Sequence, residues 1–84
     1  MVAVGEKYTH YKRSEGNDHM YEIIAIGIFK SENAYDGEEV VIYKPLYLIE
    51  ELPSYVSLLV RPRAEFEGEL EYNGKTVKRF TLVS

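Results

Sequence analysis

The chain has 84 residues, a formal net charge of −4 and no cysteine. This length predicts one small domain, and the missing cysteines exclude disulfides, a thiolate nucleophile and a thiolate zinc site. The acidic balance counts against general nucleic-acid binding, which relies on a cationic surface, although it leaves room for a local basic patch. The chain has eight tyrosines and no tryptophan, a composition that suits half-buried strands, where the ring packs inward and the hydroxyl stays in water.

The amino terminus lacks the apolar segment of a signal peptide, and no stretch approaches the roughly 18 apolar residues of a membrane span. We therefore expect a cytoplasmic protein that does not associate with membranes. The whole chain, residues 1–84, is predicted to be a single small β domain, with residues 1–4 as a disordered tail.

The first half of the chain predicts two strands. Gly5–Lys12 alternates loosely between apolar and polar residues and is interpreted as an edge-like strand, and Ser14–Asp18 has the composition of a turn. Tyr21–Phe29 is the most hydrophobic segment and is rich in β-branched isoleucine, which favours a strand. Its near-continuous apolarity predicts a central strand buried on both faces, with a bend or bulge at Gly27.

The middle of the chain predicts a loop over Ser31–Glu39 and a strand over Val40–Tyr47. Pro45 cannot donate to a sheet, so this strand either lies at an edge there or ends and bends. Leu48–Leu52 allows one helical turn but is better interpreted as a connecting loop with its leucines turned inward. Leu58–Pro62 is a short apolar run that stops at a proline, which is typical of a buried strand.

The last third contains the clearest local pattern. Arg63–Glu67 is consistent with one helical turn, and residues 65–72 then alternate between glutamates and apolar residues, as in a half-buried strand with a carboxylate-covered outer face. Asn73–Gly74 predicts a two-residue hairpin turn. The resulting register pairs Tyr72 with Lys75, Leu70 with Val77, and Glu69 with Lys78. We expect this ladder to break or bulge near Gly68, because continuing it would place a carboxylate on a core face.

Five or six short strands in so short a chain predict a mainly β fold. The two architectures that fit are a small curled antiparallel sheet and an SH3-like barrel, with at most one or two short helical turns.

The order of several short motifs resembles the DUF1653 family of small uncharacterised proteins. The motifs are Gly5-x-x-Tyr8-x-His10-Tyr11-Lys12, Tyr21-Glu22-Ile23-Ile24, Lys30-Ser31-Glu32, Val40-Val41-Ile42-Tyr43, Leu46-Tyr47, Leu59-Val60-Arg61-Pro62, Phe66 and Asn73-Gly74-Lys75-x-Val77-x-Arg79-Phe80. Leu59 stands where the family usually has tryptophan, Lys30 stands where histidine is common, and Leu48–Ser57 is longer than usual. The resemblance implies a compact β-rich domain and supplies no activity.

The segment His10-Tyr11-Lys12-Arg13 combines an imidazole, a phenol and cations. These are the groups that stack bases and hold anions. The alternative is an exposed strand end whose tyrosine packs inward. His19 is expected to be solvated near a turn. His10 and His19 have no third ligand at a recognised spacing, so no metal site is expected.

Arg61 and Arg79 are the other candidate ligand-binding cations. Arg61 follows an apolar run, so its guanidinium is expected near the sheet surface, where it would clamp a carboxylate or phosphate unless an internal salt bridge to a glutamate engages it. Arg79 has the same two interpretations, and Arg63 is expected to be plain surface. Tyr43 and Tyr47 share a face in a regular strand and would line an aromatic groove for a peptide, or else belong to a tyrosine-rich core margin.

The leading hypothesis is a non-catalytic binding module for an anionic ligand, either a nucleotide, a single-stranded nucleic acid or an acidic peptide. Its ligand-binding residues are His10, Tyr11, Lys12, Tyr43, Tyr47, Arg61 and Arg79. One alternative is an enzyme, or the accessory domain of an enzyme, with His10 as general base. Another is a structural or regulatory domain that associates through an edge strand. We expect a monomer, with no catalytic residues, no cofactor and no metal.

Overall fold

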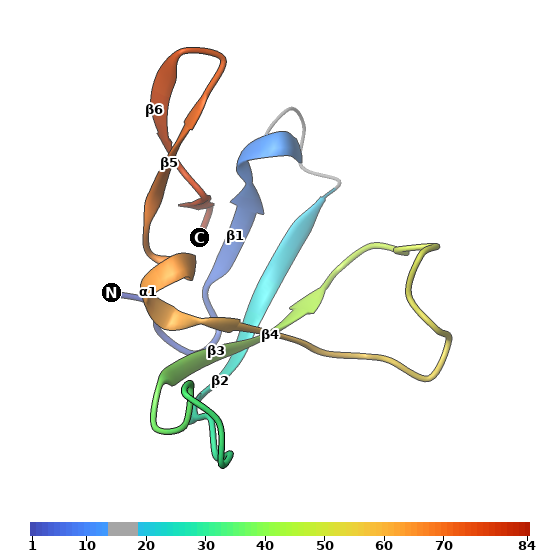
Figure 1. Ribbon diagram of the computed structural model, residues 1–84. Helices are drawn as coiled ribbons and strands as arrows, with labels where there is room; N and C mark the ends of the chain where they lie inside the picture. Colours follow the sequence, from blue (N-terminus) through green and yellow to red (C-terminus); the bar gives the residue numbers. More distant parts are fainter. Residues whose placement is uncertain (14–18) are drawn as a thin grey trace.

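Two antiparallel sheets make up the computed structural model, which describes residues 1–13 and 19–84 (Figure 1). The strands are β1 (Lys7–His10), β2 (Met20–Ile28), β3 (Glu39–Pro45), β4 (Leu59–Pro62), β5 (Glu69–Tyr72), β6 (Lys75–Lys78) and β7 (Phe80–Leu82). The helical elements are the 3₁₀ turn η1 (Tyr11–Arg13) and the single-turn helix α1 (Arg63–Phe66). The predicted turn at Ser14–Asp18 lies outside the described residues.

The larger sheet has the order β4-β3-β2-β1-β7, and β5 and β6 form the second sheet. The predicted mainly β fold is confirmed. Within the described residues β4 and β7 do not pair with each other, so the sheet is open and curled, and the SH3-like barrel does not form. No helix in this described part is long and apolar enough to span a lipid bilayer.

The β2 strand is central, as predicted, since β1 and β3 flank it. The prediction that both of its faces are buried is wrong. Ile23 is buried, whereas Ile24, Ile26 and Ile28 are exposed, because the rest of the described chain covers only part of this long strand. The bulge falls at Ile24, where the register with β3 shifts, and Gly27 pairs regularly with Val40.

The prediction that the first strand lies at an edge is wrong. β1 is shorter than predicted, and β7 pairs with its outer side, Thr9 opposite Thr81 and His10 opposite Phe80. Local sequence could not indicate this, because the pairing joins the two ends of the chain.

The β4 strand is an edge strand, and the prediction that it is buried is wrong. Val60 is 58% exposed, whereas Leu59 packs partly against the core. The strand before it, β3, ends at Pro45 as expected. Between the two, residues 48–57 form a loop that extends away from the sheet (Figure 1). Leu48 is exposed in this loop, so its side chain does not turn inward.

The helical turn and the hairpin follow the sequence prediction closely. The β5–β6 register is the predicted one, with Glu69 opposite Lys78 and Tyr72 opposite Lys75. Asn73 and Gly74 take positive φ angles of 52° and 76°, as a primed hairpin turn requires. The predicted break at Gly68 is confirmed, since β5 begins at Glu69. A Cβ at Gly68 would lie 2.9 Å from the carbonyl oxygen of Ala64, so only glycine fits this close approach.

The core lies on one face of the five-stranded sheet, which we call the core face. Its buried members are Val2, Tyr8, Tyr21, Ile23, Val41, Tyr43, Phe66 and Phe80. α1 covers this face by inserting Phe66, which is 1% exposed. Val2 belongs to this cluster, although the sequence predicts a disordered tail over residues 1–4.

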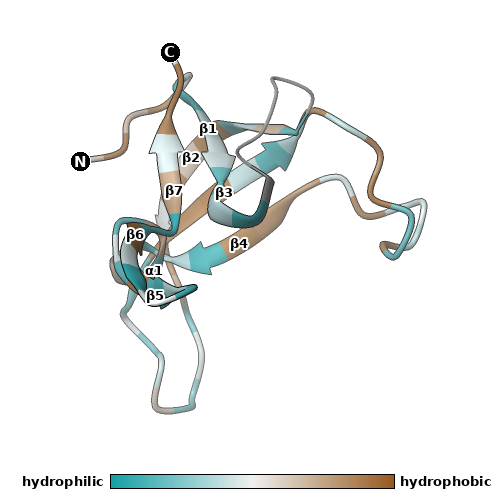
Figure 2. Cartoon of the chain, turned by 90° about the horizontal axis from the view of Figure 1, so that it is seen from above, coloured by the Kyte–Doolittle hydropathy of each residue, from teal (hydrophilic) through white to brown (hydrophobic). Residues whose placement is uncertain are grey.

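The opposite face, which we call the open face, carries the alternate residues of the same strands. Val60 and Pro62 of β4 pair there with Ile42 and Val40 of β3. Figure 2 shows hydrophobic stretches concentrated in the strands of the large sheet, whereas the loop after β2 is largely polar. The open face therefore presents apolar side chains without a second sheet packed on it in the described part of the chain.

Candidate ligand-binding site

Two stacked phenylalanines are the centre of the core face. The Phe66 and Phe80 rings are parallel within 6°, with their centroids 3.9 Å apart, and they come from α1 and β7. Tyr8, Tyr21 and Tyr43 surround them with edge-on contacts, the rings of Tyr43 and Phe80 having centroids 5.7 Å apart. Such edge-to-face pairs add to the stability that burial provides.

Arg61 reaches this cluster from β4. Its Nε donates to the hydroxyl of Tyr43 at 3.2 Å, its Nη1 pairs with the carboxylate of Glu65, and its guanidinium carbon lies 5.5 Å from the centroid of Phe80. Burial alone would lower the pKa of Arg61, but the hydrogen bonds and charges of Tyr43 and Glu65 outweigh it and raise the pKa above its usual value. The ion pair with Glu65 is the internal salt bridge that the sequence left as an alternative.

His10 and Tyr11 extend the aromatic cluster beyond β1. The His10 ring lies 4.4 Å from the Tyr11 ring and 5.1 Å from the Phe80 ring, centroid to centroid. The backbone N–H of Lys12 donates to Nδ1 of His10 at 3.3 Å. Lys12 also holds its ammonium nitrogen 5.8 Å from the Tyr11 centroid, within the range of a cation–π interaction. The η1 turn is thus what brings the imidazole, phenol and cation together.

Tyr47 joins the same cluster from the segment after β3. Its hydroxyl forms a short hydrogen bond with the hydroxyl of Tyr21, and the two rings are 5.5 Å apart. His19 packs edge-on against Tyr47 at 4.7 Å and is half-buried, so the sequence expectation of a solvated His19 is wrong. Tyr43 is only 3% exposed and is a core residue, the alternative that the sequence allowed.

Arg79 contributes to the site through its backbone. Its carbonyl oxygen accepts the N–H of Tyr11 at 2.9 Å, and its own N–H donates to Gly68 at 3.1 Å. Arg79 therefore ties η1 to the end of the hairpin, and its side chain is half-buried.

The structure thus connects six of the seven predicted ligand-binding residues through ring, cation or hydrogen-bond contacts, with Arg79 adjoining by its backbone. Phe80 and Tyr21 are the residues that join them, and neither is among the ligand-binding residues predicted from the sequence. Phe80 was detectable as the apolar neighbour of Arg79, but its position beside His10 depends on the β1–β7 pairing.

Comparison with known proteins bears on this arrangement. A family model described as a protein of unknown function (DUF1653) matches residues 6–82. The chain belongs to the DUF1653 family. Comparisons with curated proteins and with solved structures gave no match. The resemblance noted in the sequence is therefore confirmed over almost the whole length. The matched residues include all the rings of the aromatic cluster, from Tyr8 to Phe80.

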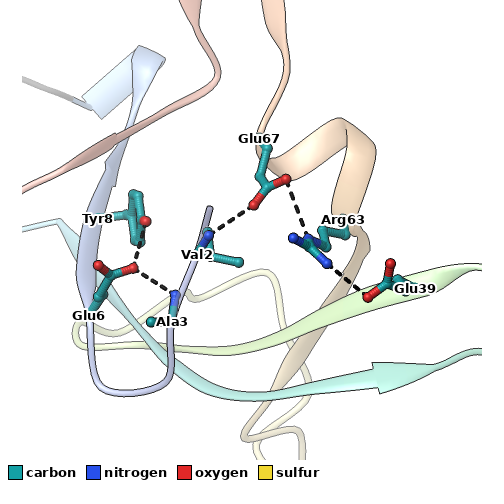
Figure 3. Close-up of polar contacts among 7 residues, drawn as sticks. All are labelled: Val2, Ala3, Glu6, Tyr8, Glu39, Arg63 and Glu67. Atoms are coloured by element: carbon teal, nitrogen blue, oxygen red, sulfur yellow. Dashed lines mark hydrogen bonds and ion pairs between the residues drawn. The ribbon is translucent and has the colours of Figure 1, made fainter.

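A second polar network of this DUF1653 chain lies where the amino-terminal segment meets α1 (Figure 3). The carboxylate of Glu67 accepts the backbone N–H of Val2 at 2.8 Å and pairs with Arg63 at 3.4 Å. Arg63 also pairs with Glu39 of β3 at 2.8 Å. Its side chain is 17% exposed, so the expectation that Arg63 is plain surface is wrong. The hydrogen bond from Val2 and the charge of Arg63 outweigh burial and lower the pKa of Glu67.

Tyr8 and Glu6 form the other half of this network (Figure 3). Glu6 accepts from the hydroxyl of Tyr8 at 2.9 Å and from the backbone N–H of Ala3 at 2.7 Å. Burial, followed by the hydrogen bond and charge of Glu6, raises the pKa of Tyr8 to about 12. These contacts fix the amino-terminal segment against the core.

Among the described residues, no three histidine, aspartate or glutamate side chains come together as a metal site would require.

Proposed function

We propose that this DUF1653 protein is a non-catalytic binding module for a small or extended anionic ligand, and that a nucleotide or a short single-stranded nucleic acid fits better than an acidic peptide. The observation that carries the proposal is the pair of cations on one connected aromatic cluster, with Lys12 over the Tyr11 ring and Arg61 over the Phe80 ring. Aromatic rings stack bases, and cations beside them attract phosphates.

Arg61 keeps capacity for a ligand in this proposal. A guanidinium has five N–H donors, and Tyr43 and Glu65 accept from two of its nitrogens. The side chain of Glu65 is 44% exposed, so it can move aside when a phosphate offers a stronger bidentate partner. The net charge of −4 favours a ligand that makes few phosphate contacts.

The experiment is a nuclear magnetic resonance titration of the labelled protein at about 20 mM salt, where exposed charges are little screened. The probes are adenosine monophosphate, an eight-nucleotide oligothymidylate and a hexaglutamate peptide. We expect the two nucleotide probes to shift amide signals within residues 8–12, 43–47 and 59–63. If none of the three probes shifts these signals, the proposal is wrong.

Matched variants separate specific contacts from general charge. Tyr11→Leu should weaken oligothymidylate binding roughly tenfold, because stacking on an aromatic ring contributes about 1–3 kcal/mol per base. Lys12→Gln should weaken it about threefold, as expected for an exposed charge. Tyr55→Leu and Lys30→Gln make the same changes at exposed positions in the loops after β3 and β2 and should leave binding unchanged.

An enzyme with His10 as general base is disfavoured by the hydrogen bond that His10 accepts. A neutral imidazole that accepts at Nδ1 carries its proton on Nε2, which would then donate rather than abstract a proton. Direct observation of the His10 nitrogen signals distinguishes the two roles. An unprotonated Nε2 at neutral pH would favour the general base, and a protonated Nε2 would favour the binding module.

A further inference from the structure

Two hollows lie side by side where β3 begins and β4 ends, away from the aromatic cluster. The first, which we call the acidic hollow, has a volume of about 400 Å³ and is lined by Glu38, Glu39, Pro62, Arg63, Ala64 and Glu67. The second, which we call the apolar hollow, has a volume of about 360 Å³ and is lined by Phe29, Tyr35, Glu38, Val40, Val60 and Pro62. Glu38 and Pro62 line both hollows, so the two hollows are adjacent.

The hollows open on opposite faces of the sheet. The apolar hollow is on the open face, because Val60 and Pro62 pair there with Ile42 and Val40. The acidic hollow is on the side of the core face, because its residues Arg63, Ala64 and Glu67 belong to α1 and its carboxyl end, which pack Phe66 into the core. Pro62 is the last residue of β4 and separates the two.

The strand between them is at the edge of its sheet. β4 pairs with β3 on one side, so its outer side presents backbone groups to which an extended segment can add as a further strand. Successive side chains of an added strand point to opposite faces. One residue of the added segment would therefore enter the apolar hollow, and its neighbour would enter the acidic hollow.

The charges of the acidic hollow determine which side chain of the added segment can enter it. It holds the carboxylates of Glu38, Glu39 and Glu67 and the single guanidinium of Arg63. Arg63 is already engaged by Glu39 and Glu67, so Glu38 adds a negative charge that Arg63 does not neutralise. A lysine or arginine side chain complements this hollow, and an acidic one is repelled.

The exposed apolar surface of the apolar hollow favours an apolar side chain from the neighbouring residue of the added segment. Phe29 is 38% exposed, Val60 58% and Tyr35 62%. Exposed apolar side chains gathered in one hollow are typical of interaction sites. An aliphatic or aromatic side chain would remove this surface from water.

We infer that the outer edge of β4 binds an extended segment of a partner protein in which an aliphatic or aromatic residue directly precedes or follows a lysine or arginine. The main chain of the segment bonds to β4, and its two side chains occupy the apolar and acidic hollows. This site goes beyond the proposed function, since it uses none of the residues of the aromatic cluster.

The test is a titration of the labelled full chain with the peptide acetyl-TTLKTT-amide, which carries adjacent leucine and lysine in a strand-forming context. Residues 38–40 and 60–64 should shift, with binding that falls at least about threefold when the lysine is replaced by glutamate or the leucine by alanine. A peptide methylated on the backbone nitrogens of both central residues should bind more weakly, because it loses main-chain hydrogen bonds. Shifts confined to the aromatic cluster, equal binding of the glutamate peptide, or the absence of shifts would overturn the inference.

A matched pair of protein variants locates the charge. Glu38→Gln should weaken peptide binding about threefold, whereas Glu71→Gln, the same change on the exposed hairpin strand β5, should not. Equal effects of the two variants would mean general charge attraction and would overturn the inference. If signals of residues 59–62 shift with protein concentration and no peptide, the occupant is a second copy of the chain, and the partner segment inferred here is wrong.

Discussion

The core face and the open face of the five-stranded sheet both carry apolar side chains, but the described chain covers them unequally. On the core face, Phe66 and Phe80 stack in the middle of a tyrosine cluster that is almost fully buried. On the open face, Val60 and the neighbouring Phe29 remain exposed. The difference shows that apolar patterning places a residue in a strand but does not decide whether its face is covered.

The largest effect is expected from removing a ring on the core face. Phe66→Ala should lower the free energy of unfolding by about 3–5 kcal/mol, because it leaves a cavity beneath Phe80. Urea denaturation measures the change, with Phe66→Leu as the milder variant if the alanine protein does not fold. Phe29→Ala, the same substitution at a 38% exposed position, should cost less than about 1.5 kcal/mol. Equal losses at the two positions would contradict the unequal covering of the faces.

An intermediate loss of stability is expected when Tyr8 ionises at high pH. Its hydroxyl lies where the core face meets the amino-terminal network. Its pKa is raised to about 12 in the folded state, against about 10 when unfolded. The folded state therefore favours the protonated phenol. The resulting contribution of Tyr8 to the free energy of unfolding is complete below pH 10 and is lost as the pH rises from about 10 through 12. The size of the loss is on the order of 2 kcal/mol.

Tyr8→Phe provides the control for this pH dependence. The variant lacks the ionising group, so its free energy of unfolding, measured by urea denaturation between pH 9 and 11.5, should fall less steeply than that of the unaltered chain. Parallel curves for the two proteins would show that Tyr8 does not titrate as described.

The smallest effect is expected on the open face. Val60→Thr keeps a β-branched side chain and places a hydroxyl in water, so the free energy of unfolding should change by less than about 0.5 kcal/mol. Val41→Thr makes the same substitution at a fully buried position of β3 and should cost about 1–3 kcal/mol, because the hydroxyl is buried. Thermal denaturation of the two variants compares the faces directly. A large loss for Val60→Thr would mean that the open face is covered in solution.

The parts of the fold that the sequence predicted correctly depend on neighbours in the chain. The hairpin register follows from Asn73 and Gly74, and the break at Gly68 follows from alternation that could not continue past Glu67. The helical turn over Arg63–Phe66 is equally local.

The parts that the sequence missed depend on distant pairing. β1 is interior because β7 returns to it from the other end of the chain. Arg63 is partly buried because Glu39 reaches it from β3, in addition to its local pair with Glu67. For the candidate site, Phe80 and Tyr21, which connect the predicted residues, were recognisable only after the strands were ordered.

The pairing of β1 with β7 also has a consequence for the order of folding. Phe80 lies in the last strand, and the first strand carries His10, its ring partner. Contacts between residues so far apart in the chain close a long loop and slow folding relative to local contacts. We therefore expect the β5–β6 hairpin to form early and the aromatic cluster to assemble late. A ribosome-bound chain would then acquire its candidate ligand site only after its carboxyl-terminal strand has emerged.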